Sequence, residues 1–326
     1  MDSNPQATKS HSDAERKKSI RRRFIMSITS RWQLYLFLLL PLAYLILFAY
    51  VPMAGLQIAF KKYSSALGMG IWGSPWVGFS QFTKFFSSYM FKRVLTNTVS
   101  VSLYALLAGF PIPILFALSL NSIQRRRYKK TVQMVAYMPY FISTVVLVGM
   151  LMQMINPRIG IFGVAYTAMT GKDAPNLIGL PDAFRHLYVW SGIWQSVGWS
   201  SIIYLAALSG IDTELHEAAQ IDGASRFQRV LHIDFPGIVP TAIILLILNS
   251  GQIMNVGFEK AFLMQNTLNL RSSEVISTYV YKVGLASGIQ DFSYATAIGL
   301  FNSLINFSII IFVNQIAKRT VGEGLW

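Results

Sequence analysis

One short polar insert, residues 210–237, lies between two strongly apolar stretches and holds the residues best suited to chemistry. It carries five acidic side chains: Asp212, Glu214, Glu217, Asp222 and Asp234. Ala218 and Ala219 would let a partner surface approach closely, while Glu217 and Asp222 would present charge to it. The insert therefore predicts a docking surface for another protein. The alternative is an ordinary loop between helices, charged only because it is exposed to water.

Local signals predict a helix, a tight turn and a second short helix within this insert. Asp212 or Thr213 can cap a helix over 214–221, because the free N–H groups of a first turn need an acceptor. Gly223 suits the left-handed residue that ends a helix. In residues 225–228, a serine followed three residues later by a glutamine forms a capping box. These signals predict two helices held at a fixed angle.

Other catalytic signatures are absent from the sequence. There is no G-x-x-x-x-G-K-[ST] loop, so the chain is not predicted to hydrolyse ATP by P-loop chemistry or to bind a cofactor itself. No G-x-S-x-G occurs, and the chain has no cysteine. Its four histidines show no metal-ligand spacing; His216 and His232, on either side of the 217–224 stretch of the insert, are interpreted as solvated or docking residues. No catalytic residue and no metal site are predicted.

The elements that must position the insert are membrane helices. The sequence is 53% hydrophobic and 13% charged, with a mean hydropathy of +0.45, whereas soluble domains carry about 25% charged residues. We predict an all-α membrane protein in which Pro236 ends the second helix of the insert, ahead of the fifth span. The six predicted spans are 32–54, 93–120, 132–155, 187–209, 238–256 and 293–317.

Polar side chains inside these spans predict the substrate path, because they are costly in lipid and usually face a cavity or another helix. Asn249, Gln252 and Asn255 recur every third residue of the fifth span and share a face. The other candidates are Trp194 on the fourth span and Asn302 and Asn306 on the sixth. Amides bind sugar hydroxyls and aromatic rings cover sugar faces. Equally, amides hold helices together and tryptophan marks the membrane interface.

Basic residues predict the orientation. Residues 1–31 hold eight Lys and Arg, and residues 121–131 hold five. Since cytoplasmic segments are enriched in Lys and Arg, both termini are predicted to be cytoplasmic. The formal net charge of +14 is attributed to topology signals and to contacts with anionic membrane lipid, and no nucleic-acid partner is predicted. Residues 1–31 are interpreted as a basic, partly disordered tail, and 318–326 as a second cytoplasmic tail.

The insert resembles the EAA loop of ABC-importer permeases, whose pattern runs E-A-A, two residues, D-G-A, then a spacer to I-x-L-P. This chain has Glu217-Ala-Ala-Gln-Ile-Asp-Gly-Ala224 and Ile233-Asp-Phe-Pro236, with Phe235 where leucine is usual. The resemblance implies that 210–237 is the coupling loop through which an ATPase subunit moves the membrane domain. The residues implied to dock are Glu217, Ala218, Ala219, Asp222, Gly223 and Ala224.

Further stretches of the sequence indicate a subgroup of these permeases. Val51-Pro-Met-Ala-Gly-Leu-Gln-Ile-Ala-Phe60, Gly73-Ser-Pro-Trp-Val-Gly78 and Gly324-Leu-Trp326 are similar to permeases for oligo- and polysaccharides, among them alginate importers. The resemblance implies a type I importer permease domain over 32–317 in the inner membrane of a bacterium. It also implies a second permease, two ATPase subunits that bind ATP and Mg²⁺, and a periplasmic solute-binding protein. The alternative is a secondary transporter or channel for a polar solute.

Overall fold

The chain folds almost entirely into helices. The computed structural model describes residues 31–64, 68, 70–288 and 290–322. Within these ranges, β structure is limited to one isolated bridge between Lys61 and Trp76, so the prediction of an all-α protein is confirmed. Most of the predicted basic tail, 1–31, and the last residues of the C-terminal tail lie outside the described residues. The chain divides into two compact units, Met1–Gln57 and Ile58–Trp326.

The described part of the first unit is an apolar helix. It runs through α2 (Trp32–Leu45), the π-helical turn η1 (Ile46–Tyr50) and α3 (Val51–Met53), and leads into the 3₁₀ helix η2 (Ala54–Phe60). No side chain of α2 is buried. A helix that is apolar on every side is suited to lipid. Twenty-nine helical residues exceed the roughly 20 needed to cross a bilayer, in agreement with the predicted first span.

Two prolines follow π-helical turns and do not break their helices. Pro52 follows η1, and Pro236 follows η5 (Val230–Asp234). Proline lacks an N–H and its ring collides with the carbonyl four residues earlier, whereas a π-turn inserts an extra residue and changes that register. In η5 the N–H of Phe235 bonds to the carbonyl of Val230 instead. The prediction that Pro236 ends a helix is therefore wrong, because one helical segment continues from 226 to 250.

The third predicted span, 132–155, is not one straight helix. It consists of α7 (Arg126–Tyr137) with the 3₁₀ turn η4 (Met138–Phe141), followed by α8 (Thr144–Met154) at an angle of 100°. Ser143 caps the second piece through Val146 N–H at 3.3 Å. The carbonyl of Ile142, freed by the break, accepts 2.7 Å from Gln195 Nε2. Gln195 of the fourth span and the cap at Ser143 thus make a break inside this apolar stretch stable.

The remaining long helices form the body of the second unit. The short helix α4 (Ser80–Phe86) is followed by α5 (Tyr89–Gly109) and α6 (Pro111–Asn121), and α5 and α6 meet at Phe110. Another short helix, α9 (Ile161–Thr170), follows α8. The fourth predicted span is α10 (Pro181–Ser209), 29 residues long. By length and composition, four helical segments among the described residues are able to cross a membrane, and the bent α7–α8 pair makes a fifth. The helix α10 is not among these segments, because its serines and Gln195 reduce its mean hydropathy.

The fifth predicted span ends earlier than expected. Here α13 (Phe235–Ser250) stops at Ser250, and turns occupy 251–254. Gln252 and Asn255 are therefore not on this helix, contrary to the prediction that they share its face with Asn249. The short elements that follow are α14 (Phe258–Met264), α15 (Leu270–Ser273), α16 (Ile276–Tyr281) and the π-turn η6 (Lys282–Ala286). The last helix is α17 (Phe292–Val321).

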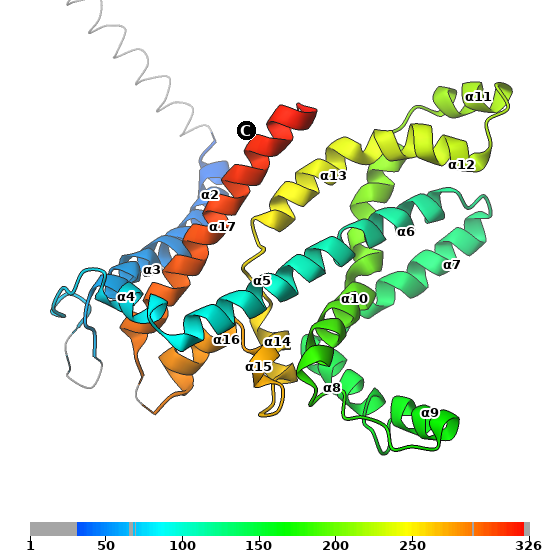
Figure 1. The fold of residues 1–326 in the computed structure, drawn as a ribbon. Coiled ribbons are helices and arrows are strands. Elements are labelled where there is room, and N and C mark those ends of the chain that lie inside the picture. Colours follow the sequence, from blue (N-terminus) through cyan, green and yellow to red (C-terminus); the bar gives the residue numbers. More distant parts are fainter. Residues whose placement is uncertain (1–30, 65–67, 69, 289, 323–326) are drawn as a thin grey trace, which may run out of the picture. The chain divides into compact units, whose positions relative to one another are not determined.

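Four apolar clusters of described residues hold the second unit together, and the smallest joins Ala59, α4 and α17. One joins α6, α10 and α13 through residues such as Ile114, Tyr204 and Ile238. Two others join α5 to the short helices after α13. Figure 1 shows α11 (Thr213–Ile221) and α12 (Arg226–Arg229) at the opposite end of this unit from α15 and α16. The core therefore links the insert at one end with the 251–291 segment at the other.

Gly198 fixes the contact between α10 and α7. A Cβ atom at this position would lie 2.1 Å from the carbonyl oxygen of Ala136, whereas a Cβ at Gly149 of α8 would meet nothing within 4 Å. We expect Gly198→Ala to destabilise the protein by about 1–3 kcal/mol, the usual cost of overpacking. Gly149→Ala is the matched control and should be neutral or slightly stabilising. Thermal unfolding of the purified protein in detergent measures both; equal Tm values would contradict this packing.

Candidate functional site

The coupling loop has the predicted helix, turn and second helix. Asp212 caps α11 by accepting a hydrogen bond of 3.0 Å from Glu214 N–H. Gly223 has a φ of +80°, and the N–H of Ala224 reaches back 2.9 Å to the carbonyl of Ala219. This left-handed residue ends α11 and reverses the chain. Ser225 and Gln228 form the reciprocal capping box that opens α12.

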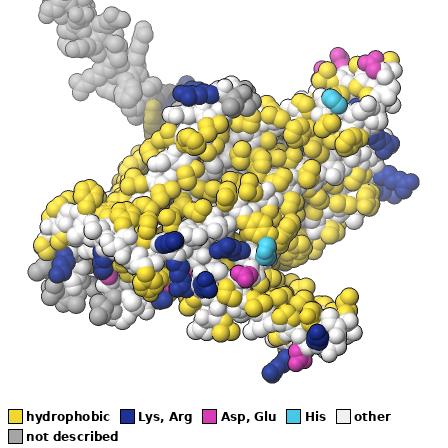
Figure 2. Space-filling model, in the orientation of Figure 1, with side chains coloured by type: hydrophobic (Ala, Val, Ile, Leu, Met, Phe, Trp, Pro, Cys, Tyr) yellow, Lys and Arg dark blue, Asp and Glu magenta, His cyan; other side chains and the backbone are white. Residues whose placement is uncertain are grey.

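The six residues predicted to dock an ATPase lie around this turn. Glu217, Ala218, Asp222 and Gly223 are exposed, while Ala219 and Ala224 are half-buried. In Figure 2, acidic side chains gather over α11. Three large apolar side chains are also exposed here: Leu215 (55%), Ile221 (87%) and Phe227 (74%). An exposed apolar group beside acids is typical of a protein interface. The sequence reasoning missed this apolar part, although its residues are adjacent to the motif.

The base of the loop is fixed by a buried carboxylate. Asp234 is only 3% exposed. Its Oδ1 lies 3.3 Å from His216 Nε2 of α11 and 3.4 Å from Asn121 Nδ2 at the end of α6. The interpretation of His216 as merely solvated is therefore wrong, because it is half-buried and contacts this acid. One carboxylate connects the coupling loop with two long helices.

A cavity of about 280 Å³ with a mixed polar and apolar lining lies in the second unit, between α5, α10 and the chain around the end of α13. Asn249, Gln252 and Asn255, the three amides predicted for the fifth span, all line it. Ser102 and Tyr188 also line it, and the Ser102 hydroxyl has no hydrogen-bond partner among the described residues. These amides reach one cavity even though only Asn249 is on α13, because the turns after Ser250 bring the other two back towards α5.

Asn302 and Asn306, the asparagines of α17 that were predicted for the path, lie behind the cavity wall. Asn302 Nδ2 and Asn306 Nδ2 donate to Asn255 Oδ1 at 3.0 and 3.2 Å. Asn306 Oδ1 also accepts 2.9 Å from the N–H of Met254. Neither asparagine is among the cavity-lining residues. Their contacts fix the chain after α13, which is the packing alternative considered for such amides.

Trp194 is separate from the cavity. Its side chain is half exposed on α10, and it is not among the residues that line the cavity. Two neighbouring tryptophans of the same helix have contacts of their own. Trp190 Nε1 donates 2.8 Å to the Tyr104 hydroxyl, and the Trp199 ring stacks on Tyr140 with centroids 4.5 Å apart. The structure thus brings three of the six predicted path residues to the cavity, two behind its wall and one elsewhere.

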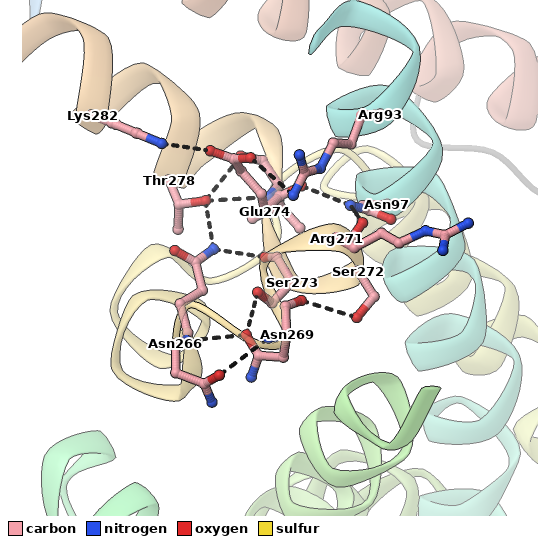
Figure 3. Close-up of polar contacts among 12 residues, drawn as sticks. Arg93, Asn97, Asn266, Asn269, Arg271, Ser272, Ser273, Glu274, Thr278 and Lys282 are labelled. Carbon is pink, nitrogen blue, oxygen red and sulfur yellow. Dashed lines mark hydrogen bonds and ion pairs between the residues drawn. The ribbon is translucent and has the colours of Figure 1, made fainter. Parts of the chain in front are cut away.

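At the opposite end from the coupling loop, a polar cluster surrounds Glu274, which is buried on the segment after α15 (Figure 3). Arg93 Nη2 lies 3.6 Å and Lys282 Nζ 3.3 Å from its carboxylate. Asn97 Nδ2 donates to the backbone carbonyls of Arg271 and Glu274 at 2.9 and 3.0 Å. This Glu274 cluster fastens the short helices to α5. Sequence reasoning missed it, because its members are far apart along the chain.

Comparison with known proteins identifies the family of this chain. Residues 109–322 match the family described as the inner membrane component of binding-protein-dependent transport systems. The chain belongs to this family. The matched residues include the coupling loop and the cavity-lining residues of α10 and of the chain around the end of α13, so the resemblance found in the EAA pattern is confirmed. Family membership also decides against the alternative of a secondary transporter or channel, and it makes the chain a transport component.

Similar proteins cover nearly the whole permease. Protein LplB of Bacillus subtilis (strain 168) is 40% identical over 296 residues, 91% of each chain. The polygalacturonan/rhamnogalacturonan transport system permease protein YteP of the same strain is 37% identical over 310 residues, 95% of each chain. The solved structure of a bacterial ABC transporter involved in the import of the acidic polysaccharide alginate matches with a TM-score of 0.83 and 37% identity. That match covers 92% of this chain and 99% of the other. The prediction of the type I permease fold is confirmed.

Proposed function

We propose that this permease imports a complex carbohydrate, an oligo- or polysaccharide, and that acidic saccharides such as alginate are within its range. The observation that carries the proposal is near-complete coverage by relatives whose names state such cargo, a polygalacturonan permease and an alginate transporter. The cavity lined by Asn249, Gln252 and Asn255 supports it, since amides and hydroxyls are suitable partners for sugar hydroxyl groups.

We propose that the coupling loop transmits the conformational change driven by ATP hydrolysis from an ATPase subunit to this permease. The exposed surface of Glu217, Ala218, Asp222 and Gly223, with Ala219 and Ala224 beneath it, docks on an ATPase subunit. The Asp234 contacts then connect that surface with α6 and α13. ATP and Mg²⁺ bind to the ATPase subunits, and this chain contributes no catalytic residue. The exposed Ile221 and Phe227 strengthen the docking assignment, because such side chains gain by leaving water.

The complete transporter contains this permease, a second permease, two ATPase subunits and a periplasmic solute-binding protein. A solved alginate transporter is in complex with a pentasaccharide-bound periplasmic protein, which supports the last partner. We place the permease in the cytoplasmic membrane of a bacterium with both termini in the cytoplasm, 32–317 as the membrane domain and 318–326 as a tail. Trp194 and Asn302 are retained as secondary candidates for the path, whereas Asn306 is assigned to packing.

The assembly proposal predicts that the purified chain alone shows no saccharide-dependent ATP hydrolysis. The complete complex, supplied with its binding protein and an oligosaccharide, is expected to show it. The physical reason is that the chain has a well-formed docking loop but no phosphate-binding loop. Phosphate release in proteoliposomes measures both preparations, with a complex lacking only this chain as control. ATP hydrolysis by the isolated chain that rises with saccharide would contradict the proposal.

A further inference from the structure

Lys260 of α14 is a half-buried cation with unused hydrogen-bonding capacity. Its Nζ donates 2.8 Å to the carbonyl of Tyr188 on α10 and lies 4.8 Å from the centre of that tyrosine ring. Gly192, one turn along α10, leaves space beside it, since a Cβ there would be 3.1 Å from Nζ. An ammonium group has three N–H donors. Among the described residues only one of them has a hydrogen-bond acceptor.

The surroundings of Lys260 carry more positive than negative charge. No carboxylate among the described residues forms an ion pair with Lys260, Arg185 or Arg271. Arg185, three residues before Tyr188 on α10, donates to Asn97 Oδ1 at 3.3 Å. The nearest buried acid in this region, Glu274, is already paired with Arg93 and Lys282.

Arg271 adds to this excess. In Figure 3 its guanidinium points away from Glu274 and carries no dashed line, although its backbone carbonyl accepts from Asn97. The side chain is exposed. Two further acids are near in sequence, Asp182 on α10 and Glu259 beside Lys260, and both are exposed and unpaired by any described cation. Burying a cation without an anion costs stability, so the arrangement is one that a bound carboxylate would improve.

Lys260 does not itself line the cavity, but it lies against a residue that does. Tyr188, whose carbonyl and ring it contacts, lines that cavity, and so does Gly257, which immediately precedes α14. A solute that is hydrogen-bonded to the cavity amides would therefore have a cation close behind the wall that Tyr188 forms. This combination suits a polyhydroxylated chain that carries carboxylates.

We propose that Lys260 is the specificity-determining residue that recognises a saccharide carboxylate, with Arg185 and Arg271 as further cations that attract the acidic chain. The proposal rests on the proposed function, since it names the chemistry of the same cavity's cargo. A carboxylate-binding role and a purely structural role of Lys260 predict different effects of a glutamine at this position. A structural Lys260 would only fasten α14 to α10 through the Tyr188 carbonyl, and a glutamine amide at this position can also donate to that carbonyl.

The test compares two cargoes in one preparation: a uronic acid tetrasaccharide and its methyl ester, in which each carboxylate is replaced by a neutral methyl carboxylate group. Uptake by proteoliposomes with the complete transporter is measured for wild type, Lys260→Gln, Lys260→Arg and Lys92→Gln. We expect Lys260→Gln to raise the KM for the acid about tenfold or more, as expected from losing a hydrogen bond to a charged group, and to leave the ester unchanged. Lys260→Arg should retain most of the preference.

Lys92 is the matched control, because it is an exposed cation of α5 without a described ion pair. Its replacement should leave the acid-to-ester ratio unaltered. The ratio within each preparation is independent of how much protein folds. An equal loss of both cargoes in Lys260→Gln, or an unchanged ratio, would overturn the inference. Failure of the wild type to transport either saccharide would instead contradict the proposed function.

Discussion

Gly223→Val is expected to reduce saccharide-stimulated ATP hydrolysis by the assembled transporter about tenfold, because an L-residue in the left-handed region costs roughly 1–2 kcal/mol. Gly223 has a φ of +80° and ends α11. A Cβ there would meet nothing within 4 Å, so the effect comes from the backbone and not from a clash. Valine would shift the angle between α11 and α12 and displace the docking surface. Phosphate release and uptake are measured with the same proteoliposomes.

Two variants isolate the cause of this effect. Asparagine tolerates positive φ better than valine does, so Gly223→Asn should retain most of the activity. Gly171 also has a positive φ, +68°, with open space around it, but it ends α9 and not the coupling loop. Gly171→Val should therefore leave coupling intact. Glu217→Lys, which reverses a charge of the same surface, should reduce coupling as Gly223→Val does. Normal transport by Gly223→Val and Glu217→Lys would refute the docking assignment.

Replacing Asn249, Gln252 and Asn255 together by alanine is expected to weaken uptake severely. Each single change should weaken it by a factor of roughly 2 to 10, since a neutral hydrogen bond contributes about 0.5–1.5 kcal/mol. All three side chains line the same cavity, so their contributions act on one bound solute. Uptake kinetics and thermal stability are measured for every variant, because Asn255 also accepts hydrogen bonds from α17.

Asn306→Ala serves as the structural comparison for these three amides. Asn306 is 8% exposed, bonds to Met254 N–H and does not line the cavity. Its replacement should lower the Tm while the surviving protein keeps the wild-type KM. The cavity amides should show the reverse. If the triple variant loses folded protein but its remainder transports normally, the amides are structural and the solute passes elsewhere.

The coupling loop was predictable because its signals are local. The cap at Asp212, the glycine at 223 and the capping box of Ser225 and Gln228 each involve residues only a few positions apart. Residue types and their spacing are therefore enough to predict the helix, the turn and the second helix. The same holds for the first span, whose apolar residues follow one another without interruption. The six long apolar stretches and their all-helical outcome followed from hydropathy for the same reason.

The errors arose where distant contacts decide the backbone. Hydropathy continues through Ile142, but the break there is stabilised by Gln195 from another helix. It also continues past Ser250, where Asn306 of α17 holds the chain in a turn. Half-buried His216 and its partner, the buried Asp234, are separated along the chain by the turn and the second helix of the insert. No spacing within a single segment reveals such partners. Three of the amides that line the cavity could therefore be predicted from their residue types, but the shape of the cavity could not.

ATP-dependent uptake is the most direct measurement of the central claim. Proteoliposomes containing this permease, its partner permease and the two ATPase subunits receive a binding protein and a labelled uronic acid oligosaccharide on the outside. ATP and Mg²⁺, or a non-hydrolysable analogue, are enclosed inside. The account predicts accumulation with ATP, none with the analogue, and strongly reduced accumulation when the permease carries Gly223→Val. Accumulation that needs only an ion gradient and is the same with the analogue and with Gly223→Val would contradict it.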